Sequence, residues 1–144
     1  MRLRLFVFAE YGSAGTDNKL TIAGIIDGVN VKRRPGTEAK PGGTISLPPI
    51  YMVAVVEGSI SDGLTHALSL RFLNDDAKEV TKPANLGRFS FVVNPLGRPM
   101  SANLIVQLGG LVVPGPGDYI LELLVGGRPI GEAPFYVTDV TATG

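Results

Sequence analysis

The chain has 144 residues, with 13 Lys or Arg against 13 Asp or Glu, so its formal net charge is +0. A neutral chain has no long-range field that favours nucleic acid or an anionic membrane, and we expect neither as a partner. Cysteine is absent, which excludes disulfides, thiolate chemistry and cysteine-ligated metal or iron–sulfur sites. At this length we expect one domain over residues 1–144.

The first apolar stretch predicts a strand over residues 2–10. Its odd-numbered apolar residues would share one face, and Phe6 and Phe8 would take the other. The run stops at Glu10, so it is shorter than the core of a signal peptide. Together with the absence of cysteine, this length predicts a cytoplasmic protein.

Further strands follow from alternating apolar residues and from the turn residues between them. They are expected at residues 19–26, 50–57, 64–73, 86–93, 102–108 and 119–125, with a return strand through Val137. Residues 50–57 are apolar on both faces, which predicts a central strand covered on both sides. No stretch keeps a helical period for three turns without Gly or Pro, so no helix is expected.

The last hairpin carries the clearest pattern. Four residues fall on one face of its first strand, namely Tyr119, Leu121, Leu123 and Val125. Gly126-Gly127 is a turn dipeptide that tolerates positive φ. A tyrosine at the start of such a strand is typical of a corner tyrosine, whose hydroxyl bonds to backbone. We therefore predict an all-β fold, a single immunoglobulin-like antiparallel β-sandwich of about seven to nine strands.

Residues 33–49 form the longest stretch without periodicity, and they are rich in proline and glycine. A loop of this length inside a compact domain is usually functional or mobile. A covering loop over one end of the sandwich is the plainer interpretation, and a binding arm is the alternative.

Several motifs resemble those of a known family: Leu-Phe-Val-Phe-Ala-Glu at residues 5–10, Lys-Leu-Thr-Ile-Ala-Gly-Ile at 19–25, Asp-Gly at 62–63 and Pro-Gly-Asp-Tyr at 116–119. In this order they resemble a family of small bacterial proteins of unknown function. The resemblance covers most of the chain and implies an immunoglobulin-like β-sandwich. It carries over no catalytic residue, because the family has none assigned.

Catalytic chemistry has little support in the residues. His66 is the sole histidine, and it lies on an otherwise apolar strand face. No nucleophile elbow, phosphate-binding loop or zinc-binding helix motif accompanies it. We expect a histidine that bonds to backbone, a protein that is not an enzyme, and no cofactor.

The candidate metal ligands are Asn74, Asp75 and Asp76, joined by Asp62 or Asp118 from a neighbouring loop. Calcium takes six to eight oxygen ligands, and loops converge at the ends of a sandwich. The same residues are good turn formers, and the calcium-loop spacing is absent. We therefore expect no metal site here.

Apolar residues on the presumed outer faces carry the functional hypothesis. They are Phe6, Phe8, Tyr51, Ile120 and Leu124. Either the 33–49 loop covers them or another chain does. We expect a non-enzymatic interaction or assembly module that forms a homo-oligomer or joins a larger protein assembly, with a particle- or phage-associated role as a special case by analogy. The alternative is a ligand-binding β-sandwich for carbohydrate or calcium at one loop end.

Overall fold

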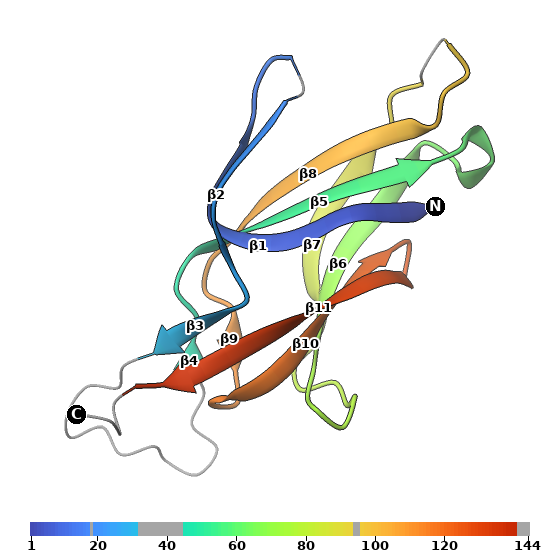
Figure 1. Cartoon of the computed structure of the whole chain (residues 1–144). Helices are drawn as coiled ribbons and strands as arrows, with labels where there is room; N and C mark the ends of the chain where they lie inside the picture. Colours follow the sequence, from blue (N-terminus) through green and yellow to red (C-terminus); the bar gives the residue numbers. More distant parts are fainter. Residues whose placement is uncertain (18, 32–44, 94–95, 141–144) are drawn as a thin grey trace.

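The computed structural model describes residues 1–17, 19–31, 45–93 and 96–140 (Figure 1). Their regular structure is almost entirely β, which confirms the predicted class. The elements are β1 (Arg2–Ala14), β2 (Leu20–Ile26), β3 (Gly28–Val31), β4 (Ile45–Ser46), β5 (Ile50–Gly58), the 3-10 turn η1 (Ile60–Asp62), β6 (Thr65–Leu73), β7 (Ala84–Ser90), β8 (Met100–Leu108), β9 (Val112–Val113), β10 (Gly117–Val125) and β11 (Arg128–Asp139). Within these residues no helix is long and apolar enough to cross a membrane.

The strands form a four-stranded sheet in the order β2-β1-β5-β8, a five-stranded sheet in the order β3-β11-β10-β6-β7, and the pair β4-β9. The described residues therefore hold eleven strands, more than the seven to nine predicted. The difference arises mainly because β4, within the 33–49 stretch, pairs with β9 over two residues, too short to leave an alternating pattern.

The prediction of purely antiparallel sheets also needs correction. β3 pairs with β11 in parallel. The chain leaves the edge of the four-stranded sheet after β2 and enters the five-stranded sheet as β3. There β3 lies at the edge beside β11 and runs in the same direction.

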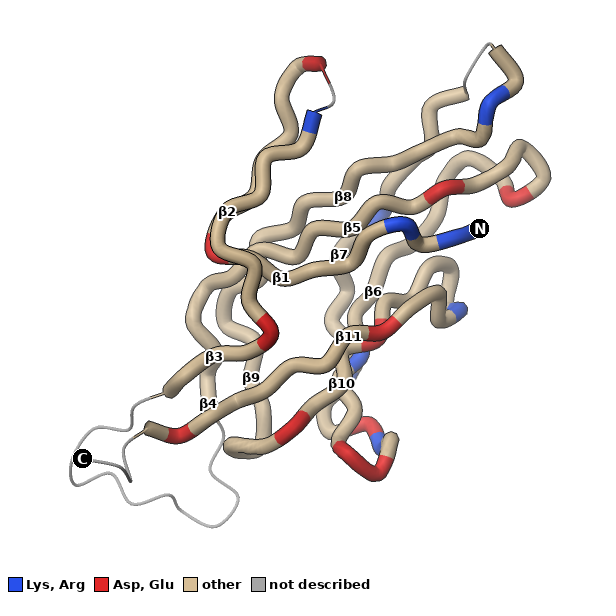
Figure 2. Tube along the Cα trace, viewed as in Figure 1, with Lys and Arg blue, Asp and Glu red and all other residues tan. Residues whose placement is uncertain are grey.

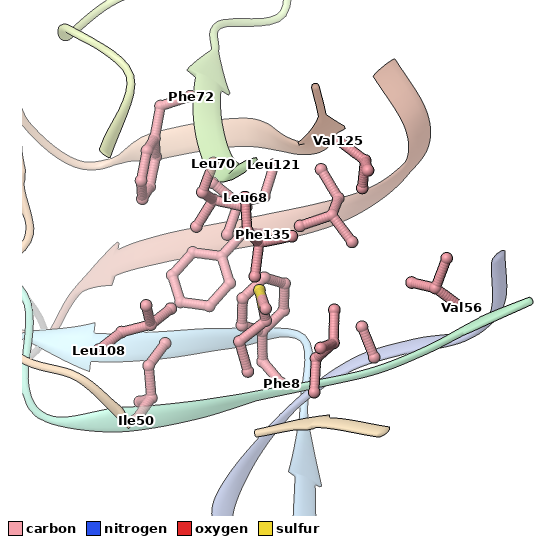
Figure 3. Packing of buried hydrophobic residues seen from close by; sticks show 14 of the residues in the cluster. Phe8, Ile50, Val56, Leu68, Leu70, Phe72, Leu108, Leu121, Val125 and Phe135 are labelled. Atoms are coloured by element: carbon pink, nitrogen blue, oxygen red, sulfur yellow. The ribbon is translucent and has the colours of Figure 1, made fainter. Parts of the chain in front are cut away.

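The two larger sheets face each other across one apolar core (Figure 3). Phe8 of β1 meets Phe135 of β11 with ring centroids 5.3 Å apart. Fully burying one large apolar side chain stabilises a fold by about 1.5–3 kcal/mol. The residues that contribute from both layers include Ile50, Met52, Val56, Leu68, Leu70, Phe72, Leu108, Leu121, Leu123 and Val125.

A β-bulge decides which way β1 faces. Its register against β5 shifts between Leu3 and Leu5. The shift breaks the strict alternation on which the sequence prediction depended, since an extra residue in one strand reverses the faces after it. Leu3, Phe6 and Phe8 consequently all pack toward the core. Placing Phe6 and Phe8 on the outer face was wrong.

β5 is covered on both faces, as predicted for residues 50–57, and its outer face is partly buried. Met52 and Ala54 belong to the core, whereas Val53 points to the outer face and is also fully buried. The cover comes from the far half of β1, because a Cβ at Gly12 would lie 2.9 Å from Val53 Cγ2 and 3.7 Å from Ile105 Cγ2. The β1–β2 hairpin therefore crosses over the outer face before its tip projects from the body (Figure 1).

The last hairpin forms as its sequence predicted. Gly126 and Gly127 have φ of 59° and 79°, so the turn uses the left-handed region. Tyr119 is buried, and its hydroxyl donates to the Gly115 carbonyl at 2.6 Å. Burial raises the pKa of Tyr119 above its usual value of 10.0. The corner tyrosine is confirmed.

Replacing Tyr119 with Phe removes this hydrogen bond and keeps the ring. We expect Tyr119→Phe to lower the free energy of unfolding by about 0.5–1.5 kcal/mol, the net worth of one such bond. Because the folded pKa is raised, the hydroxyl's contribution is present below pH 10 and is lost as the pH rises through that region. Urea denaturation at pH 7 and pH 11 measures both effects. Equal denaturation midpoints at pH 7 would contradict this role.

Close approach of β3 to β11 requires a glycine at Gly28. A Cβ there would overlap the Tyr136 carbonyl oxygen, which is backbone and cannot move aside cheaply. We expect Gly28→Ala to destabilise the protein by about 1–3 kcal/mol, as overpacking does. Gly109→Ala is the matched control, since no atom lies within 4 Å of its added Cβ. Equal thermal midpoints for the two variants would disprove the close approach.

Candidate functional site

The five residues predicted for an interface do not form an exposed patch. Phe8 is only 1% exposed, and Leu124 is also buried. Phe6, Tyr51 and Ile120 are half-buried. Phe8 and Leu124 are therefore unavailable to a partner in this fold. The predicted cover by the 33–49 loop falls largely on residues outside those the structure describes.

Contacts within the chain cover part of Phe6 and Tyr51, and Ile120 lies on an inner strand of its sheet. Phe6 packs against Phe8 with ring centroids 5.3 Å apart. Tyr51 lies edge-on to Tyr11 of the projecting hairpin, at 5.7 Å. Ile120 stands between two strands, β6 and β11, in the register of the five-stranded sheet. The chain thus supplies partners for side chains that the sequence assigned to another molecule.

Exposed large apolar side chains gather instead on two loops at one end of the molecule. We call them the loop-end surface: Ile60, Leu64, Val92, Val93 and Leu96. Val92 is 80% exposed, Leu96 75% and Ile60 74%. The β5–β6 and β7–β8 connections that carry them lie at the same end as the N-terminus (Figure 1).

The backbone beneath the loop-end surface is held firmly. The Phe91 N–H donates to the Leu64 carbonyl at 2.8 Å, which ties the two loops together. The Phe91 ring is buried over Gly58, since a Cβ at that glycine would lie 2.9 Å from two ring carbons. Because Phe91 points inward, the next residue, Val92, points out into solvent.

A cleft of about 520 Å³ opens beside these loops. Its apolar walls include Ile60, Val93 and Met100, and charged side chains stand around it. Glu57 pairs with Arg2 at 2.7 Å and with Arg4 at 3.1 Å. Figure 2 shows charges of both signs at this end, so the surface has no single sign that would select a charged ligand.

Asp62 shapes the β5–β6 loop. Its Oδ2 accepts the Ser59 backbone N–H at 2.8 Å and the Ser59 hydroxyl at 3.1 Å. These two hydrogen bonds, the backbone one first, lower the pKa of Asp62 below its usual value of 3.8, although desolvation opposes them. The carboxylate of Asp62 therefore stabilises the β5–β6 loop, in which Ile60 of the η1 turn is exposed.

His66 contacts a backbone carbonyl and two aromatic rings. Its Nε2 lies 3.0 Å from the Gly63 carbonyl oxygen. The ring packs against Phe89 and Phe91, with centroids 5.7 Å away in each case. The prediction that His66 bonds to backbone is confirmed. The contact stabilises the β5–β6 loop, which Asp62 also stabilises.

The candidate metal ligands form a turn. Asn74 Oδ1 accepts the backbone N–H of Asp76 at 3.0 Å and of Lys78 at 2.9 Å. Asn74, Asp75 and Asp118 share the lining of one cleft of about 440 Å³, whereas Asp62 lies at the loop-end cleft. Within the described ranges no three His, Cys, Asp or Glu side chains converge to hold a metal ion.

The sequence contained a signal for the loop-end surface that was missed. Residues 86–93 were predicted as one strand, but β7 ends at Ser90, so Val92 and Val93 belong to a loop. Ile60 and Leu96 lie in stretches of turn-forming residues. A large apolar residue in a turn has no sheet face to occupy, and that position could have marked it as exposed.

Comparison with known families places the chain. Residues 4–138 match the family of unknown function DUF6941. The chain belongs to this family. The match confirms the resemblance to a family of unknown function that covers most of the chain. Membership in DUF6941 assigns no activity to the loop-end surface or to any other site.

No curated protein matches the chain. Among solved structures it is similar to the Pseudomonas fluorescens alkylpurine DNA glycosylase AlkC bound to DNA containing an abasic site analog, with a TM-score of 0.40 and 14% sequence identity. The similarity covers 78% of this chain and 28% of the glycosylase chain. The chain thus spans less than a third of that protein, and its function has to be argued from its own residues.

Asp62→Asn tests whether the Asp62 carboxylate stabilises the β5–β6 loop, because the substitution removes the charge and keeps the size of the side chain. A carboxyl group with a lowered folded pKa stabilises the fold above its unfolded pKa of 3.8, and the effect is lost as the pH falls through the folded value. We expect the variant to melt below the wild type at pH 6 and the difference to shrink below pH 3.8. A difference that is constant with pH would contradict the proposed charge effect.

Calcium tests the acidic turn. A ligand that binds only the folded state raises the melting temperature. Because Asn74 Oδ1 already accepts two backbone N–H groups, we expect millimolar calcium to leave the melting temperature unchanged. Magnesium at the same concentration is the control for ionic strength. A rise with calcium alone would establish a metal site at this turn.

Proposed function

We propose that this chain is a non-enzymatic interaction module that assembles with other protein chains through the loop-end surface. The carrying observation is the exposure of its apolar side chains, above 70% for Ile60, Val92 and Leu96. Each large apolar side chain left in water forgoes about 1.5–3 kcal/mol of burial. Exposed apolar patches with polar rims are typical of protein contact sites.

The architecture that supports this proposal is an immunoglobulin-like sandwich. Two facing sheets and the corner Tyr119 agree with it. The parallel β3 and the short β4–β9 pair depart from the common pattern. In such domains the connecting loops gather at the ends of the sheets, and loop ends serve as contact surfaces on a rigid scaffold. Partners would be further copies of the chain or a larger protein assembly.

The hydrogen bonds of the candidate catalytic and metal-binding residues support a non-enzymatic role. His66 Nε2 contacts a backbone carbonyl, and Asn74 Oδ1 accepts two backbone N–H groups. Asp62 accepts two hydrogen bonds from Ser59. Each group serves the local loop structure, whereas a catalytic group must be directed at a substrate.

Photo-crosslinking in the native cell tests the proposal. A photoreactive residue at Val92 or at Leu96 should give the same discrete protein adduct. The matched control is Tyr136 on β11, a partly exposed apolar residue away from the loop end, which should give none. Absence of adducts from Val92 and Leu96, or equal adducts from Tyr136, would refute the loop-end surface as the contact.

A second variant separates contact from mere proximity. With the photoreactive residue at Ile60, the double substitution Val92→Ser with Leu96→Ser should abolish the adduct. Both side chains are exposed, so the melting temperature should change little. Persistence of the adduct would show that the apolar side chains do not hold the partner.

A further inference from the structure

Strand β2 is an open edge of the four-stranded sheet. Among the residues that the structure describes, β1 is its one neighbour in the sheet order. Leu20–Ile26 contains no charged residue and no proline. Sheet edges are normally protected against pairing with other chains by charges, prolines or a covering segment. The opposite edge strand, β8, differs in that it approaches β7 of the other sheet.

The hydrogen bonds of the hairpin fix which backbone groups of β2 point outward. The Gly15 N–H donates to the Lys19 carbonyl at 2.9 Å, and Ala14 stands opposite Leu20. In an antiparallel pair the bonded residues alternate, so Thr21, Ala23 and Ile25 bond toward β1. The N–H and C=O groups at the intervening positions are therefore directed to the free edge. These positions are Leu20, Ile22 and Ile26, and Gly24 would join them once its backbone is extended.

When the β2 edges of two copies pair antiparallel, one register places every residue with outward backbone groups opposite another such residue in the second copy. It is centred on Ala23, where a twofold axis would place Leu20 opposite Ile26 and Ile22 opposite Gly24. Hydrogen-bonded positions then face hydrogen-bonded positions along the whole edge. The contact is self-complementary, as a closed dimer requires.

Charge supports the same register. Lys19 precedes the strand and Asp27 follows it. Pairing centred on Ala23 therefore places Lys19 of each copy opposite Asp27 of the other, which gives two such pairs in the dimer. The Lys19 side chain is 84% exposed and Asp27 is exposed, although Asp17 lies 3.6 Å from Lys19 within the chain. Figure 2 shows this pattern, with an uncharged strand between a blue segment near the hairpin tip and a red one at the base.

The pairing would also cover apolar surface. Ile25 is 66% exposed, and Tyr11 on the adjacent strand is 49% exposed. In the Ala23-centred register Ile25 lies opposite Thr21 of the second copy. Its side chain would leave water without any change in the core.

Gly24 is the residue that must move. Its φ is 68°, outside the extended region, and the Glu10 carboxylate lies close to it. Glycine passes between these conformations without a Cβ penalty. Full pairing therefore requires Gly24 to become extended, which would regulate how readily the edge opens to a partner.

We propose that the chain forms a twofold homodimer by antiparallel pairing of β2 with β2 of a second copy, centred on Ala23 and flanked by two Lys19–Asp27 ion pairs. The inference rests on the proposed function, to which it adds the first partner. A dimer joined at β2 presents two loop-end surfaces on one particle. Two linked sites bind a shared assembly more tightly than either site alone.

Charge exchange is the test, measured by sedimentation of the intact chain across micromolar concentrations. Lys19→Asp and Asp27→Lys should each weaken dimerisation about tenfold, because each turns two attractive pairs into repulsive ones. The double variant Lys19→Asp with Asp27→Lys should restore it. Lys82→Asp, an exposed lysine on another loop, is the control and should have no effect. Single variants that dimerise like the wild type, or a double variant that fails to recover while melting normally, would overturn the register.

Gly24→Ala provides an independent measurement. A Cβ disfavours φ of 68° and favours the extended state, so the variant should dimerise more tightly. Unchanged or weaker dimerisation in a folded variant would contradict the required extension. A wild type that remains at 15.1 kDa overturns the β2 pairing, yet leaves the loop-end surface to be judged by crosslinking at Val92.

Discussion

The structure depends on the burial of β5 on both of its faces. Ile50–Gly58 is an inner, apolar strand of the four-stranded sheet. If either of its faces were exposed to water, the fold would lose much of the hydrophobic stabilisation that this strand provides. The five-stranded sheet covers the inner face. On the outer face, the β1–β2 hairpin lies over Val53. Both the core and the projecting hairpin follow from this one requirement.

Covering β5 in this way has a consequence at the edge of the sheet. The far half of β1 leaves β5 to cross its outer face, and β2 must follow because it pairs with β1. β2 therefore ends as a projecting edge strand, with β1 as its one neighbour within the described part of the chain. The same hairpin that completes the fold thus creates the surface that we propose for self-association.

In the loops, polar and apolar side chains have different roles. Polar groups such as Asp62, His66 and Asn74 bond to nearby backbone and set loop conformation. The apolar side chains between them, Ile60 and Val92 above all, point into solvent. Fixed loops lose little conformational entropy on binding, so a rigid apolar end is suited to contact with another protein. A β2-paired dimer would carry two such ends.

The sequence by itself determined the local features. Alternating apolar residues identified most strands, Gly126-Gly127 the turn, and Tyr119 the corner hydrogen bond. It also predicted that residues 50–57 would be covered on both sides. These features succeed because they depend on period-two geometry and on turn chemistry, which neighbouring residues decide.

The tertiary structure alone decided which faces are buried and which surface is open. A bulge before Leu5 turned Phe6 and Phe8 inward, and contacts within the chain buried Leu124. The early end of β7 exposed Val92. Each outcome depends on register or on segments far apart in the sequence. A single-residue shift in a strand reverses its faces without changing its composition, so the apolar pattern of residues 2–10 could not assign the core face of β1 in advance.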